Sequence, residues 1–161
     1  MQKTNSAKIS LFGHQPIDER RSVIVALTQR NDALTGADVR QLRRALFEDE
    51  AVSREVAMAL FALEQAQRRA QHPACVEWTA FFIECLTDHV VWQARPTGVI
   101  SPEQAEWLSL QADAVNSLNS FALLANVLAE AHQAPQWFVE AVQARAQTPA
   151  IKAALERARS A

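Results

Sequence analysis

Residues 74–93 read ACVEWTAFFIECLTDHVVWQ and form the most apolar segment of the chain. Their large apolar side chains recur at the spacing of one helix face and extend onto the neighbouring positions, which predicts a single helix over about 74–93. A helix that is apolar over most of its circumference belongs at the centre of a bundle. The main face comprises Trp78, Phe81, Phe82, Cys85, Leu86, His89 and Trp92, and it is widened by Ile83, Val90 and Val91.

Helix start signals lie on both sides of this segment. The clearest is Ser101-Pro102-Glu103-Gln104, with Ser as N-cap, Pro at the first helical position and Gln at the third. Thr35 with Asp38 resembles a capping box, and Ser53 is placed to cap the helix after the acidic turn Glu48-Asp49-Glu50. Strand signals are nearly absent, so we expect an all-α fold of seven or eight helices. Further helices are expected to begin near Pro16, after Asp113–Ser117, at Pro135 and at Thr148-Pro149.

The chain also repeats its order of helices and turns. The segment that begins at Thr35 parallels the one that begins at Ser101, and Pro73 matches Pro135 as the start of a third helix. We therefore expect two pseudo-symmetric helical repeats sharing one core. They are expected at about 35–93 and 101–147, followed by a C-terminal helix at 149–160, in a single domain 17–161 behind a flexible tail 1–16.

Composition excludes several classes of protein. The 161 residues are 49% hydrophobic, enough for one buried core, and the net charge of −2 lacks the basic footprint of a nucleic-acid binder. No apolar stretch approaches the roughly 20 residues that span a bilayer, and residues 1–16 lack a signal-peptide pattern. Cys75 and Cys85 lie about 15 Å apart along one helix and cannot pair. We expect a cytoplasmic protein without a membrane span or a nucleic-acid partner.

Charge is unevenly distributed along the chain. Residues 1–72 carry a net charge of +2, whereas residues 73–161 carry −4. The acidic part would favour cations or the basic surface of another protein over phosphates. A solvated face with no ligand is the alternative. The opposite charges of the two parts would also allow head-to-tail self-association into a homo-oligomer.

Two carboxylates on the central helix are candidate metal ligands. Glu84 and Asp88 are one turn apart, about 6 Å along the helix axis, and would raise one another's pKa if unpaired. They could hold a hard divalent cation if a second segment, near Asp113, supplied more oxygen ligands. An exposed acidic stripe without a metal is the alternative interpretation.

Signals for catalysis are weak. Cys85 and His89 have the spacing of a nucleophile and its base, but they lie on the apolar face, which favours a core thiol and a buried histidine. No G-x-S-x-G, H-E-x-x-H or C-x-x-C motif occurs. We therefore expect no enzymatic activity and no cofactor other than a divalent cation.

Three segments resemble those of uncharacterised proteobacterial proteins related to the tellurite-resistance TerB-like helical family. They are FIECLTDHVVWQ at 82–93, PTGVISPEQAEWL at 96–108 and FALLANVL at 121–128. The resemblance implies an all-helical fold with internal pseudo-symmetry, an acidic surface that binds divalent metal, and no enzymatic activity.

Two functional hypotheses follow. The first is a non-enzymatic cytoplasmic helical module that acts through protein–protein contacts. The second is a divalent-cation-binding, TerB-like stress-response protein that uses an acidic helix face, with Glu84, Asp88 and Asp113 as the candidate ligands.

Overall fold

The computed structural model describes residues 19–46 and 51–160, and this part of the chain is helical apart from its turns and one isolated bridge between Val99 and Gln133. The all-α prediction is confirmed. The predicted tail 1–16, the helix start at Pro16 and the turn Glu48-Asp49-Glu50 lie outside the described residues. The helices are α2 (Arg20–Arg30), α3 (Gly36–Leu46), α4 (Arg54–Arg69), α5 (Val76–Thr87), α6 (Pro102–Val115), α7 (Leu118–Glu130), α8 (Gln136–Ala146) and α9 (Pro149–Arg159).

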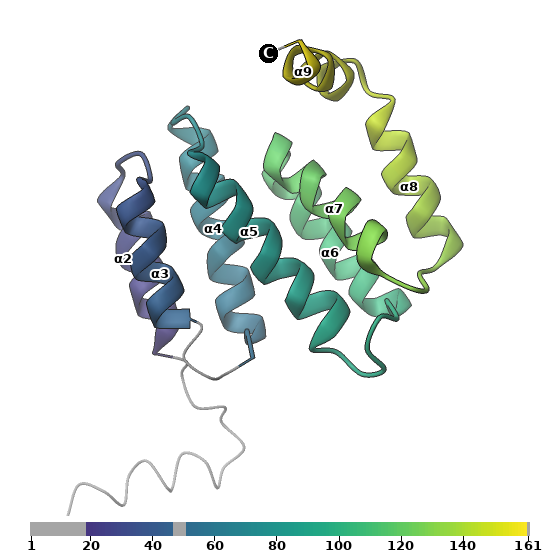
Figure 1. Ribbon diagram of the computed structural model, residues 1–161, viewed down its shortest axis with the longest axis horizontal. Coiled ribbons are helices and arrows are strands. Elements are labelled where there is room, and N and C mark those ends of the chain that lie inside the picture. Colours follow the sequence, from purple (N-terminus) through teal and green to yellow (C-terminus); the bar gives the residue numbers. More distant parts are fainter. Residues whose placement is uncertain (1–18, 47–50, 161) are drawn as a thin grey trace, which may run out of the picture.

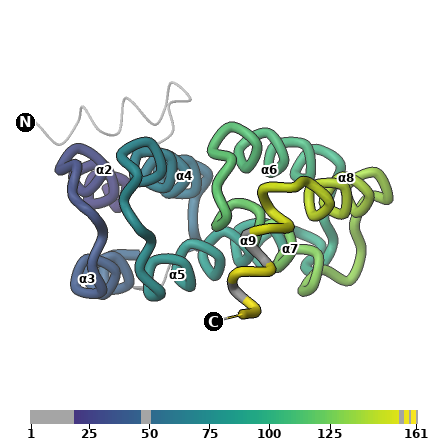
Figure 2. The backbone as a smooth tube through the Cα atoms, turned by 90° about the horizontal axis from the view of Figure 1, so that it is seen from above, coloured from purple at the N-terminus to yellow at the C-terminus, as the bar shows by residue number. Residues whose placement is uncertain are grey.

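The helices form two rows (Figure 2). In one row α2 packs against α4 and α4 against α6, with α8 next to them. In the other row α3 packs against α5 and α5 against α7. The chain crosses between the rows at every turn, so that α2 with α3, α4 with α5 and α6 with α7 form successive hairpins (Figure 1). α9 departs from this order and packs against α8. No helix in the described part of the chain has the length and apolar character needed to cross a membrane.

The three hairpins reverse direction in the same way, at the same end of the array (Figure 1). Asn31, Gln71 and Asn116 have positive φ angles of 59°, 58° and 51°, and each follows the first helix of its hairpin. The structural repeat is therefore a helical hairpin of about 40 to 45 residues. The predicted repeats at 35–93 and 101–147 are not confirmed, because α6 packs against α7 whereas α3 packs against α2 and α5.

The predicted helix starts at Ser101 and Ser53 carry side-chain capping hydrogen bonds, whereas Thr148 forms none at the start of α9. Ser101 Oγ accepts from the Gln104 backbone N–H at 3.2 Å, and the Gln104 side chain accepts from the Ser101 N–H at 3.4 Å. Ser53 Oγ accepts from the Val56 N–H at 3.2 Å. These caps satisfy N–H groups that a helix cannot satisfy internally, which explains why local sequence was enough to find them.

α5 lies at the centre of the core, as predicted. Trp78, Phe81 and Phe82 are fully buried, and Phe61 of α4 meets Phe82 edge to face at 5.5 Å between ring centroids. Edge-to-face contacts of this kind stabilise aromatic clusters beyond the area they bury. The packing of α5 against α3, α4 and α7 therefore joins both rows into one core.

A buried carboxylate, Glu64 of α4, accepts hydrogen bonds from three side chains on two segments, α5 and the start of α7. Only 4% of the residue is exposed. Its Oε1 accepts from Trp78 Nε1 at 2.8 Å and from Asn119 Nδ2 at 3.1 Å, and its Oε2 accepts from Ser117 Oγ at 2.9 Å. Asn119 Oδ1 in turn accepts from Thr79 Oγ1 at 3.0 Å. These bonds fix the starts of α5 and α7 relative to α4.

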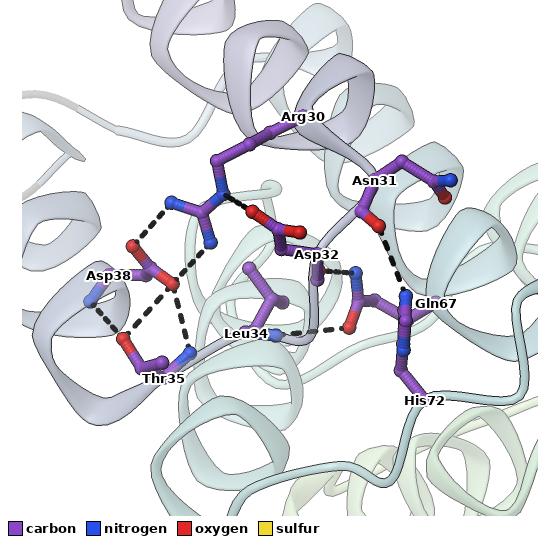
Figure 3. A network of polar contacts seen from close by, with 8 residues as sticks. All are labelled: Arg30, Asn31, Asp32, Leu34, Thr35, Asp38, Gln67 and His72. Carbon is purple, nitrogen blue, oxygen red and sulfur yellow. Dashed lines mark hydrogen bonds and ion pairs between the residues drawn. The ribbon is translucent and has the colours of Figure 1, made fainter.

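A second polar network holds the turn between α2 and α3 against the end of α4 (Figure 3). Gln67 accepts from the Leu34 N–H at 3.1 Å and donates to the Asp32 carbonyl at 2.8 Å. On the other side of the turn, Arg30 donates two hydrogen bonds to Asp38, at 2.9 and 2.7 Å. The guanidinium holds the pKa of Asp38 well below its usual range. α4 thus binds the turns of both neighbouring hairpins.

The Glu64 network predicts a large loss of stability on truncation. Glu64→Ala leaves the Trp78, Asn119 and Ser117 donors buried without an acceptor, and should lower the free energy of unfolding by about 3 kcal/mol. Urea denaturation measures this change. The matched control is Glu103→Gln, which neutralises an exposed carboxylate on α6 and should leave stability within about 0.5 kcal/mol of wild type. Equal stability of Glu64→Ala and the control would contradict this role.

Candidate functional site

Three carboxylates from two neighbouring helices lie near one another at one end of the array. Glu84 is on α5, Asp88 begins the π-helical turn that continues α5, and Glu130 ends α7. Partial burial raises the pKa of Asp88, and the charges of Glu84 and Glu130 raise it further. We call these three residues the carboxylate face. Its negative charges repel one another, so a cationic ligand would stabilise them.

Glu130 is held in place by neutral donors. Its Oε1 accepts from the Trp92 indole N–H at 3.0 Å, and its Oε2 accepts from Asn126 Nδ2 at 2.8 Å. Asn126 also donates to Thr87 Oγ1 at 2.9 Å, which joins α7 to α5. Within residues 19–46 and 51–160, neither Glu130 nor Asp88 forms an ion pair with Lys, Arg or His. The negative charge of both side chains is therefore uncompensated in this part of the chain.

Among the residues that the structure describes, Glu84 is the one member of the carboxylate face that forms an ion pair. Arg43 of α3 donates to it at 2.9 Å, and both side chains are largely exposed. The Arg43 guanidinium also lies over the Phe81 ring, 5.2 Å from its centroid. An exposed ion pair of this kind is weak and is screened by salt, so Glu84 still contributes to the field around Asp88.

The π-helical turn Asp88–Trp92 changes which side chains face the core. The prediction of one regular helix placed His89 and Trp92 on the buried face. Val90 and Val91, which were predicted to widen this face, are buried, and His89 is partly buried and hydrogen-bonded to the Val52 carbonyl. The prediction was wrong for Trp92, which is 37% exposed, because a π-turn adds a residue to the helical repeat and rotates the following side chains. This rotation brings the Trp92 indole to Glu130.

Asp113, the third predicted metal ligand, lies elsewhere. It lies in the last turn of α6, next to the turn between α6 and α7. Arg145 of α8 donates two hydrogen bonds to it there, one of them at 2.8 Å. Asp88 is near Glu130 at the opposite end of α7, and the 13 residues of α7 separate the two ends by about 20 Å. The set Glu84, Asp88 and Asp113 is therefore not brought together.

Glu130 takes the place that was predicted for Asp113. The sequence signal for Glu130 is its spacing of one helical turn from Asn126. The structure shows that both side chains contact the segment of α5 and its π-helical turn. Using that signal requires knowing that α5 and α7 run parallel, side by side. Among the described residues, no group of three or more His, Cys, Asp or Glu side chains is arranged to hold a metal ion.

Cys85 and His89 do not form a reactive pair. Burial, with a smaller contribution from the charge of Glu84, raises the pKa of the Cys85 thiol to about 12, so the thiolate needed for nucleophilic attack is disfavoured. His89 donates from Nδ1 to the Val52 carbonyl at 2.7 Å, and its ring packs edge to face on Trp107. Burial lowers the pKa of His89, which favours the neutral ring. Both residues serve the packing of the core.

Comparison with known proteins finds no relative. No protein-family model matches the chain, and no curated protein and no solved structure matches it. The resemblance to the TerB-like family therefore stays a prediction, and the functional inference below is based on the geometry of the carboxylate face.

The raised pKa of Asp88 predicts a pH-dependent gain of stability on neutralisation. A carboxylate whose folded pKa is raised opposes folding above that pKa, and the opposition vanishes once the group is protonated. Asp88→Asn should therefore stabilise the protein at about pH 7 by about 0.2–0.5 kcal/mol, the range for one like-charge pair on a helix. The gain should shrink as the pH falls through the raised pKa of Asp88, and it should be lost below about 4, where Asp88 is protonated in both the folded and the unfolded chain.

Urea denaturation of wild type and Asp88→Asn at both pH values measures this gain. Glu106→Gln, on the other row of helices, is the control and should show no such pH dependence. A variant Asp88→Asn that is less stable than wild type at neutral pH would contradict the repulsion among these carboxylates.

Proposed function

We propose that the protein is a non-enzymatic helical module that acts through contacts with another protein, and that the carboxylate face makes these contacts. The observation that carries the proposal is the uncompensated charge of Asp88 and Glu130, together with the raised pKa of Asp88. A basic partner surface would relieve this repulsion and would be attracted from a distance. The half-exposed Trp92 beside Glu130 adds an aromatic side chain, a type that is enriched in protein interfaces.

The potentially reactive side chains are buried or hydrogen-bonded within the protein, which favours a non-enzymatic role. Glu64 accepts from three donors, Cys85 is buried as a thiol, and His89 is bound to a backbone carbonyl. A catalytic group needs access to a substrate and a pKa suited to its task. Glu64 and Cys85 are buried away from any substrate, and His89 is held by a backbone carbonyl, which supports a binding role for the exposed face.

Site-specific photo-crosslinking in a lysate of the source cells tests the proposal. A photoreactive residue at Ala80, exposed one turn before Glu84, should form adducts with another protein. The same residue at Ala62, exposed on α4 in the other row, should not. The Ala80 adducts should fall several-fold in Asp88→Asn/Glu130→Gln, because the attraction between the charges is lost.

The charge control for this experiment is Glu103→Gln/Glu106→Gln, which removes the same number of charges from α6. It should leave the Ala80 adducts unchanged. Adducts that form equally from Ala62, or that survive neutralisation of the carboxylate face, would overturn the proposal.

A second candidate function is divalent-cation binding, as the TerB-like resemblance implies. The charge repulsion at Asp88 favours it, since a divalent cation would lower that repulsion, and the three carboxylates would have to move closer together to share the ion. Thermal melts of chelator-treated protein in Ca²⁺, Mg²⁺, Mn²⁺ and Zn²⁺ test it. Binding at 100 times Kd would add about 2.7 kcal/mol of stability, a rise in Tm of several degrees.

The position of Asp113 supplies the control for the metal experiment. A saturable rise in Tm that is lost in Asp88→Asn/Glu130→Gln but kept in Asp113→Asn would support a cation at the carboxylate face. A flat response to all four cations would exclude this function.

A further inference from the structure

The carboxylate face is one end of a longer exposed surface along α5 and α7. The two helices lie side by side and parallel, because Thr79 contacts Asn119 near their starts and Trp92 contacts Glu130 at their ends. At their first turns, Val76 is 83% exposed and Leu118 is 49% exposed. Covering these two apolar side chains with another molecule would remove apolar surface from water, which is favourable.

A groove lies beneath the apolar end of this surface. It has a volume of about 440 Å³ and is lined in part by Leu118, Ala74 and Thr79. Arg68 and the buried Glu64 also line it, so this end has no excess of negative charge that would attract a cation. The two ends of the surface therefore favour different chemistry: apolar side chains at the starts of α5 and α7, and cations at the carboxylate face.

The spacing of the two ends fits a partner in helical form. Twelve residues separate Val76 from Asp88, and twelve separate Leu118 from Glu130, which corresponds to about 18 Å along each helix. Between the ends, Ala80 and Ala125 are exposed and small, which lets a second backbone approach closely. A helix of three to four turns would span this distance.

We infer, on the basis of the proposed protein-binding function, that the partner presents a basic amphipathic helix to this surface. Its apolar side chains cover Val76 and Leu118, and its Lys or Arg side chains, three to four turns away, meet Asp88 and Glu130. A cation there also reaches the exposed ring of Trp92, where a cation–π contact adds to the ionic attraction. Charge complementarity selects this occupant over an acidic or neutral helix.

Two synthetic peptides of about 18 residues test the inference against the full chain. One carries Leu residues at one end and Lys and Arg at the other, spaced about 12 residues apart, and the second has Gln in place of every basic residue. Fluorescence anisotropy should show saturable binding of the basic peptide, weakened by salt, and at least tenfold weaker binding of the Gln peptide.

Variants of the protein locate the peptide. Asp88→Asn/Glu130→Gln and Leu118→Ser should each raise the Kd of the basic peptide about tenfold, equivalent to 1.4 kcal/mol. Glu103→Gln/Glu106→Gln should leave the Kd unchanged. All five substituted positions are exposed or partly exposed, and thermal melts verify that each variant folds.

Three results would overturn the inference: no binding of the basic peptide, equal binding of the Gln peptide, or binding that ignores the variants of the surface. Self-association of the chain that the same variants abolish would also overturn it, since the occupant would then be a second copy. If photo-crosslinking at Ala80 still yields charge-dependent adducts while the basic peptide does not bind, the proposed function stands and only the nature of the partner changes.

Discussion

The buried carboxylate of Glu64 determines how the two rows of helices fit together. It can only accept hydrogen bonds, and each of its three donors comes from a different position near the starts of α5 and α7. Since a buried acceptor must be satisfied, α5 and α7 cannot slide along one another without losing these bonds. The same register places the Trp92 indole at Glu130, at the far end of the two helices. The carboxylate face therefore depends on an interaction that lies about three helical turns away from it.

The π-helical turn then sets which side chains at this end of α5 face the core and which face α7. By rotating Val90 and Val91 inward it closes the core below α5, and by turning Trp92 outward it supplies the donor that holds Glu130. π-turns inside α-helices are often found at functional sites. Here the turn has a definite local effect, because it combines an exposed aromatic ring with carboxylates from two helices.

The sequence was sufficient for features that arise from local chemistry. The caps at Ser101 and Ser53 and the central position of residues 74–93 were all predicted, since each depends on residues within a few positions of one another. Glu64 could not be found in this way. Its donors Trp78, Ser117 and Asn119 lie 14, 53 and 55 residues away, and a glutamate within a helix is ordinarily solvated. For the same reason, Glu84 and Asp88 were recognised together as neighbours on one helix, whereas Glu130 required the parallel packing of α5 and α7.

Asn31, Gln71 and Asn116, in the left-handed backbone conformation, mark the turns of three similar hairpins, which are the modules of the fold. In residues 19–46 and 51–160 the main contacts between hairpins join sequence neighbours, through α2 with α4, α3 with α5, α4 with α6 and α5 with α7. The stability of such an array divides into terms for single hairpins and terms for the interfaces between neighbours. The hairpin of α4 and α5 has a neighbour on each side. Damage to it separates the array into two parts, whereas damage to α9, which packs against α8, stays local. The surface along α5 and α7 thus crosses the interface between the middle hairpin and the next, so a ligand that binds across both helices also fastens two modules together.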